Sequence, residues 1–146
     1  MVACCWLSAC IAGNRSKDMA TKHRILVVED DAGTAHLLAQ IVQRAGYVAV
    51  VARGAREALA YLQEEEADLL LLDLMMREMD GWSLLEIIKS DARLAPLPVI
   101  IVSARHPQED PVRTQAHAGM FVDYLLKPFE VDELVARIKQ VLGQSL

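Results

Sequence analysis

The hydrophobic pattern of this chain alternates between short, continuous apolar runs and longer stretches in which apolar residues recur at helical spacing. An apolar run without alternation is typical of a strand that is buried on both faces, as in a parallel sheet covered by helices. The clearest example is 69–72, four consecutive leucines followed directly by Asp73. Together the runs predict five strands, over residues 23–28, 47–51, 69–72, 98–102 and 121–126.

A helix is predicted after each strand. The first begins after Asp31, a suitable N-cap, and ends at Gly46. The second runs from Ala55 into the acidic residues 64–66. The third helix is expected to bury the side formed by Leu84, Leu85, Ile87 and Ile88. The fifth is expected to end at Gly143 as its C-cap and to pack through Leu134, Val135, Ile138, Val141 and Leu142.

The predicted fourth helix, 110–119, differs from the others in its weak apolar face. Its apolar side chains are only Val112, Ala116 and Ala118. A helix with so few apolar contacts is expected to be more mobile than its neighbours.

The regular succession of strands and helices predicts a single α/β domain. Each β-α unit takes roughly 22 to 25 residues, a length that suits parallel strands joined by right-handed helical crossovers. The sequence therefore predicts a doubly wound fold, with one parallel sheet and helices on both faces. The 146 residues are enough for one hydrophobic core, and we assign 23–146 to this domain and 1–22 to an N-terminal extension.

The extension holds all the cysteines of the chain, Cys4, Cys5 and Cys10. The domain therefore needs neither a disulfide nor a thiolate metal site, as expected of a cytoplasmic protein. The start of the extension is mildly apolar, like a short signal sequence, and 7–10 is similar to a lipoprotein box. However, no lysine or arginine precedes the very short apolar part. We interpret 1–22 as a disordered extension, or as residues upstream of a true start at Met19.

Charge narrows the range of partners. The formal net charge is −5; three basic residues against one acidic residue give 1–22 a charge of +2, which leaves −7 for 23–146. An acidic domain argues against direct binding of nucleic acid. No apolar run has the length of a transmembrane helix, so no membrane contact is expected.

Polar side chains stand at the carboxyl ends of four predicted strands: Glu29, Asp30 and Asp31 after the first, Asp73 after the third, Ser103 after the fourth and Lys127 after the fifth. These strand ends meet at one edge of the sheet. Carboxylates that share a cleft repel one another unless a divalent cation is bound, and oxygen ligands favour Mg²⁺ over Zn²⁺. A hydroxyl and an ammonium at the same edge suit a ligand with anionic oxygens, such as a phosphoryl group. Taken singly, each residue could instead be a cap, a turn residue or a solvated lysine.

Four motifs in this order resemble the receiver domain of bacterial two-component response regulators: Val27-Val28-Glu29-Asp30, Leu72-Asp73 through Met79-Asp80-Gly81, Val102-Ser103-Ala104, and Tyr124-Leu125-Leu126-Lys127-Pro128-Phe129. The resemblance runs from about His23 to the C-terminus. It implies a flavodoxin-like fold, with strand order 2-1-3-4-5 and five helices.

The resemblance also implies a chemistry for the acidic residues. Asp73 would be the nucleophile that accepts a phosphoryl group from a histidine kinase or a phosphotransfer protein. Mg²⁺ would be bound by Asp30, by Asp73 and by the backbone carbonyl of Met75, with Glu29 contributing through water.

Three further residues take part in the implied switch. Lys127 would pair with a phosphoryl oxygen, and in this family the Lys127-Pro128 bond is cis. Ser103 would move inward to form a hydrogen bond with the phosphoryl group, and Tyr124 would follow from an exposed to a buried rotamer. The result would be a two-state change in the face made by the fourth helix, the fifth strand and the fifth helix.

Two positions depart from the family pattern. Arg77 stands where a proline is common, so the loop should be looser and a guanidinium lies near the cleft. The segment from Gly119 to Tyr124 is one residue longer than usual, which affects the register of the fifth strand.

Two further positions bear on how fast an acyl phosphate on Asp73 would be hydrolysed. Met75 and Arg105 follow Asp73 and Ser103 by two residues, and neither side chain can orient an attacking water as a carboxylate or carboxamide would. Slow self-dephosphorylation is therefore expected.

The sequence thus favours a cytoplasmic, single-domain response regulator that is not an enzyme, since the chain ends with the fifth helix. It would signal through a downstream protein, or by forming a homodimer through the switch face. A degenerate receiver that binds partners without phosphorylation is the alternative, and Arg77 keeps it open. A phosphatase of the haloacid dehalogenase type fits poorly, because it needs an aspartate at the position of Met75.

Overall fold

A computed structural model describes residues 22–143. The predicted extension 1–22 lies outside these residues, apart from Lys22. The described part contains one sheet of five parallel strands in the order β2-β1-β3-β4-β5, which confirms the predicted doubly wound, flavodoxin-like class. The strands are β1 Arg24–Val28, β2 Val48–Ala52, β3 Leu69–Leu72, β4 Val99–Ser103 and β5 Asp123–Leu126.

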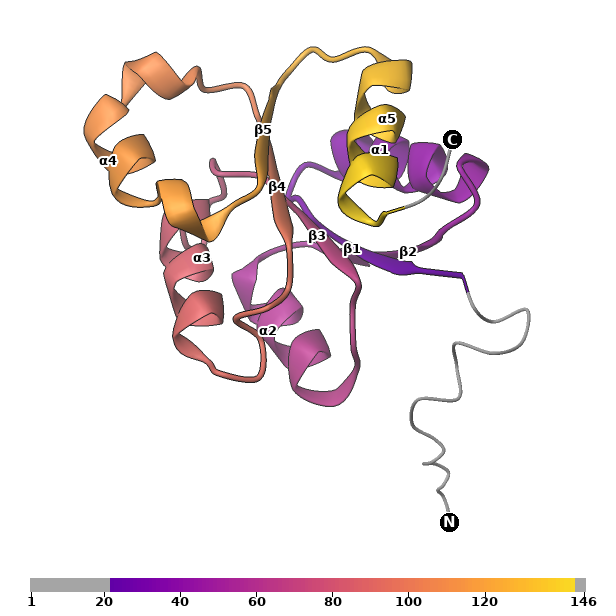
Figure 1. Cartoon of the computed structure of the whole chain (residues 1–146), viewed down its shortest axis with the longest axis horizontal. Coiled ribbons are helices and arrows are strands. Elements are labelled where there is room, and N and C mark those ends of the chain that lie inside the picture. Colours follow the sequence, from indigo (N-terminus) through magenta and orange to yellow (C-terminus); the bar gives the residue numbers. More distant parts are fainter. Residues whose placement is uncertain (1–21, 144–146) are drawn as a thin grey trace.

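Helices cover both faces of the sheet, α1 and α5 on one side and α2, α3 and α4 on the other (Figure 1). The helices are α1 Ala32–Arg44, α2 Ala55–Glu64, α3 Gly81–Ser90, α4 Pro111–Ala116 and α5 Val131–Val141. Two short 3-10 turns, η3 Pro107–Glu109 and η4 Ala118–Met120, flank α4. Among residues 22–143, no helix is long and apolar enough to cross a membrane.

The leucine run of β3 shows how the two layers are built. Leu69 and Leu71 pack with residues of α1 and α5, whereas Leu70 and Leu72 pack with residues of α2 and α3. Side chains alternate between the two faces of a strand, so a strand that is covered on both sides must be apolar at every position. All four leucines are accordingly buried.

The predicted helix ends are mostly confirmed. The Asp31 side chain accepts a hydrogen bond from the backbone N–H of Thr34 and caps α1. Gly46 follows this helix with φ of +100°, and Gly143 follows α5 with φ of +72°. Residues that carry a side chain rarely adopt a backbone conformation with positive φ, whereas glycine does so readily. The C-cap of α5 is Leu142, and Gly143 is the residue after it.

Some sequence predictions need correction. β2 begins one residue later than expected, and β5 begins at Asp123. Before it, only the backbone N–H of Val122 reaches β4, where it donates to the carbonyl of Val99 at 2.8 Å. Ile87 was expected to be buried, but it is 41% exposed, since it points away from the face formed by Leu84 and Ile88. The helix predicted over 110–119 is confined to α4, which has no buried residue of its own.

Candidate functional site

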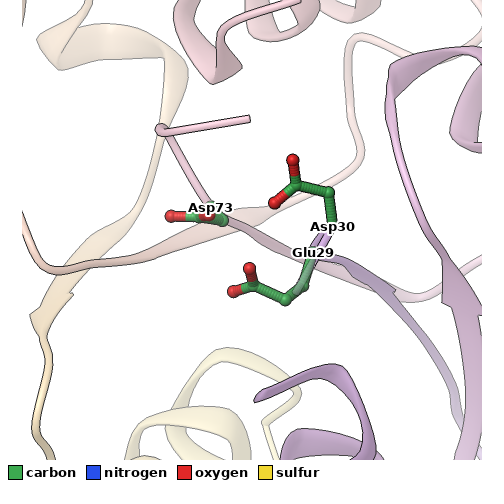
Figure 2. Close-up of side chains that lie close together, drawn as sticks. All are labelled: Glu29, Asp30 and Asp73. Carbon is green, nitrogen blue, oxygen red and sulfur yellow. The ribbon is translucent and has the colours of Figure 1, made fainter. Parts of the chain in front are cut away.

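Three carboxylates converge at the carboxyl edge of the sheet. β1 and β3 are neighbours, with Val28 in register with Leu72, so the residues that follow them also lie side by side. Glu29, Asp30 and Asp73 each offer a carboxylate oxygen, and these oxygens lie within 4.8 Å of one another. Figure 2 shows the three side chains gathered at the ends of these strands.

Burial makes this cluster electrostatically costly. Glu29 is 2% exposed and Asp73 is 5% exposed, so neither carboxylate is well hydrated. Burial, followed by the neighbouring charge of Glu29, raises the pKa of Asp73 from 3.8 to about 7, although Lys127 acts in the opposite direction. A divalent cation at this position would relieve the repulsion, and the oxygen-only donor set suits Mg²⁺.

Lys127 brings a positive charge to the cluster from the end of β5. Its Nζ lies 2.7 Å from Glu29 Oε1 and 3.8 Å from Asp73 Oδ1. At these distances the ammonium bridges two of the carboxylates and lies close enough to contact an anionic group on Asp73 as well. The peptide bond between Lys127 and Pro128 is cis.

The loop after β3 fixes the carboxylate of Asp73. The backbone N–H of Met75 donates to Asp73 Oδ1 at 3.3 Å, and the backbone N–H of Gly81 donates to the carbonyl of Leu74 at 2.8 Å. A Cβ atom at Gly81 would lie 2.6 Å from the carbonyl oxygen of Asp73 and 2.7 Å from Leu74 Cα. Only glycine allows α3 to begin this close to the site.

Asp80 links the start of α3 to α4. Its side chain accepts a hydrogen bond from the backbone N–H of Ser83 and so caps α3. Arg113 Nη2 lies 3.1 Å from the other carboxylate oxygen of Asp80. An aspartate before a glycine and an apolar helix is a recognisable cap in the sequence, but the partner from α4, 33 residues away, is not predictable.

Arg77 contacts one of the three carboxylates. Its backbone N–H donates to Asp30 Oδ2 at 2.9 Å, and its Nε lies 3.4 Å from the same oxygen. The sequence placed this guanidinium near the cleft but did not identify its partner. Arg53, which sequence reasoning missed, donates to the backbone carbonyl of Asp30 at 3.0 Å.

Ser103 and Tyr124 lie on the β4 and β5 side of the site. Ser103 is fully buried at the end of β4, and its Oγ accepts a hydrogen bond from the backbone N–H of Arg105 at 3.1 Å. Tyr124 is half-buried, its hydroxyl donates to the carbonyl of Arg105, and burial raises its pKa. The two side chains thus share Arg105 as a backbone partner, so a movement of the β4–α4 loop would affect both.

Comparison with known proteins agrees with this geometry. The family described as the response regulator receiver domain matches residues 25–139. The chain belongs to the response regulator receiver family. Phosphorylation and Mg²⁺ binding at an acidic cluster are general properties of receiver domains, which are signalling domains.

Several individual proteins are similar to this receiver. The transcriptional regulatory protein GltR of Pseudomonas aeruginosa is 43% identical over 132 residues, which cover 86% of this chain and 51% of GltR. The heme response regulator HssR of Staphylococcus saprophyticus is 37% identical, over 80% of this chain and 50% of HssR. This chain therefore spans about half the length of these relatives.

A solved structure is also similar. The CheY-like response regulator receiver domain protein from Methanospirillum hungatei superposes with a TM-score of 0.75 at 29% identity, covering 84% of this chain and 94% of that one. The described part thus has the size and topology of a receiver domain.

Proposed function

We propose that this receiver accepts a phosphoryl group on Asp73 from a histidine kinase or a phosphotransfer protein, in the presence of Mg²⁺. The observation that carries the proposal is the convergence of three carboxylates and one ammonium at the end of β3. An acyl phosphate would form when a carboxylate oxygen of Asp73 attacks the phosphorus, while the bond from phosphorus to the donor's imidazole nitrogen breaks.

The metal ligands would be Asp30, Asp73, the backbone carbonyl of Met75 and, through water, Glu29. When bound, Mg²⁺ neutralises charge that develops on the phosphoryl oxygens. The pKa of Asp73, raised by burial to about 7, supports this assignment, because an ionised nucleophile in this cluster requires a compensating cation. Met75 N–H keeps the carboxylate in a fixed orientation for attack.

Two residues would stabilise the product. Lys127, whose Nζ is already 3.8 Å from Asp73 Oδ1, would pair with a phosphoryl oxygen. Ser103 would exchange its hydrogen bond to Arg105 for one with the phosphoryl group, and Tyr124 would follow because it bonds to the same loop. The expected consequence is a change in the face formed by α4, β5 and α5.

A cavity beside the site is suited to the donor. It has a volume of about 400 Å³, and its lining includes three arginines, Arg77, Arg105 and Arg113, and one aspartate, Asp80, which is paired with Arg113. The excess of basic over acidic side chains in the lining would attract a phosphorylated donor to the acidic cluster. We infer that the donor protein docks across this cavity.

The output of the proposed receiver would be a protein contact, either with a downstream target or with a second copy through the α4–β5–α5 face, in the cytoplasm. The charge of −7 on residues 23–146 supports a protein partner over direct binding of nucleic acid by these residues. The names of GltR and HssR describe whole proteins of twice the matched length, so their outputs are not assigned to this chain.

The experiment compares intact masses after incubation with acetyl phosphate, with and without Mg²⁺. We expect the wild type to gain one phosphoryl mass only with Mg²⁺, and Asp73→Asn to gain none. Asp91→Asn, an exposed carboxylate at the end of α3, is the matched control and should behave like the wild type. No gain in the wild type, with Mg²⁺ binding shown by calorimetry, would favour the phosphorylation-independent adaptor instead.

A further inference from the structure

His117 occupies an unusual position between α3 and α4. It is the C-cap of α4, yet it is only 6% exposed, whereas no residue within α4 is buried. Its ring stacks on the indole of Trp82, with ring centroids 4.7 Å apart and an angle of 26° between the planes. The buried contact that holds this end of α4 therefore comes from a titratable side chain that lies just beyond the helix.

Both ring nitrogens of His117 face hydrogen-bond acceptors. Nδ1 lies 2.7 Å from the backbone carbonyl oxygen of Arg113 in α4, and Nε2 lies 2.6 Å from Glu86 Oε2 in α3. A backbone carbonyl cannot donate, and an ionised carboxylate only accepts. A neutral imidazole has one N–H, so both contacts are hydrogen bonds only when the ring carries two protons.

The surroundings favour this charged form. Glu86 is 57% exposed at its side chain, so its carboxylate is well hydrated and serves as the acceptor in this contact. The face of Trp82 offers a favourable surface for a cation. The nearest basic side chain on α4, Arg113, directs its guanidinium to Asp80 and neutralises that carboxylate. On the β5 side the neighbour of Trp82 is Phe121, which carries no charge.

We propose that His117 is a proton-operated clasp that ties α4 to α3. With two protons, the imidazolium joins the C-terminal end of α4 to Glu86 and stacks on Trp82. When one proton leaves, one ring nitrogen presents a lone pair to an acceptor, and that hydrogen bond becomes a repulsion. Because α4 buries no residue of its own, loss of the bond should loosen the helix as a unit.

The clasp would make α4 responsive to pH near neutrality, where histidine commonly changes its charge. If the receiver works as proposed above, an assumption on which this one consequence rests, protonation of His117 would oppose the movement of α4 after phosphorylation. The clasp itself is independent of phosphorylation and of Mg²⁺, so it can be tested on the unphosphorylated protein.

The test follows Trp82 fluorescence and histidine NMR signals of the full chain between about pH 5 and pH 9. A Trp6→Phe background leaves Trp82 as the only tryptophan. We expect its emission to follow the titration of His117, and His117→Gln to abolish the transition. Removing the carboxylate charge with Glu86→Gln should lower the midpoint of the His117 titration by about one pH unit. Glu133→Gln on α5 is the matched control and should leave the midpoint unchanged.

Hydrogen exchange completes the test. The amides of 112–117 should exchange several-fold faster above the His117 midpoint than below it, relative to those of α1, and the difference should disappear in Glu86→Gln. A His117 midpoint that does not respond to Glu86→Gln, or an α4 exchange rate whose ratio to that of α1 is the same on both sides of the midpoint, would overturn the clasp. Neither result depends on whether Asp73 accepts a phosphoryl group.

Discussion

Replacement of Asp73 by asparagine should stabilise the metal-free protein. The carboxylate is 5% exposed, and burial together with Glu29 raises its pKa from 3.8 to about 7. The folded state therefore binds the proton more tightly than the unfolded state. The sign follows from linkage: as pH rises from about 4 to about 7, ionisation of Asp73 is opposed in the folded state, so the free energy of unfolding falls.

The magnitude follows from the same numbers. A pKa of about 7 in place of 3.8 corresponds to about 4 kcal/mol at about 1.4 kcal/mol per pKa unit. The asparagine amide is itself a buried polar group whose desolvation offsets part of the gain, and we take about half of this value. Asp73→Asn removes the charge and keeps an oxygen that can accept from Met75 N–H. It should raise the free energy of unfolding by about 2 kcal/mol at pH near 8.

The assay is urea unfolding in the presence of a chelator, at about pH 4.5 and about pH 8. The free energy of unfolding of Asp73→Asn should exceed that of the wild type at the higher pH and nearly equal it at the lower pH. Mg²⁺ at the higher pH should stabilise the wild type and reduce the difference. Asp132→Asn, in the exposed first turn of α5, is the control and should show no comparable gain. A gain that is equal at both pH values would refute the electrostatic explanation.

Three further predictions concern the loops around the site. Gly81→Ala should lower the free energy of unfolding by roughly 2 to 3 kcal/mol, because its Cβ would lie 2.6 Å from the Asp73 carbonyl oxygen, whereas Gly119→Ala meets no atom within 4 Å; equal urea midpoints would contradict this. Arg77→Ala should tighten Mg²⁺ binding about two- to fourfold, since it removes an exposed cation 3.4 Å from the Asp30 carboxylate. Calorimetry measures the affinity, and an unchanged or weaker value would show that Arg77 instead positions the Asp30 carboxylate for the metal. The phosphorylated protein should persist for many minutes with Mg²⁺, because Met75 and Arg105 cannot orient water; a half-life of seconds would contradict this.

Sequence reasoning predicted the elements with long apolar runs or a clear helical face. The unbroken leucines of β3 and the apolar face of α1 are each compatible with few other secondary structures. Once the sheet was predicted to be parallel, Glu29, Asp30 and Asp73 were expected to meet at its carboxyl edge. The edge strand β5 was less predictable, because 121–122 have the composition of a strand but lie before β5, and a single backbone hydrogen bond joins Val122 to Val99 of β4. Ile87 was misplaced because its neighbour Ile88 already fills the buried position of that turn.

Contacts between polar side chains that are far apart in the sequence could not be predicted from the sequence alone. The salt bridge between Arg113 and Asp80, and the contact of His117 with Glu86, join residues 33 and 31 positions apart. No periodicity encodes such pairs, which depend on how α4 lies against α3. The same weak apolar face that predicted a poorly anchored helix at 110–119 explains why these polar contacts matter: they replace the hydrophobic packing that α4 lacks.

The most direct test of the account is to locate the phosphoryl group on the chain. After incubation with acetyl phosphate and Mg²⁺, reduction with borohydride converts an aspartyl phosphate to homoserine, which tandem mass spectrometry can assign to a residue. We predict homoserine at position 73, and none in samples prepared without Mg²⁺. Homoserine at Asp30 or at another carboxylate, with Asp73 unmodified, would contradict the assignment of Asp73 as the phosphoacceptor.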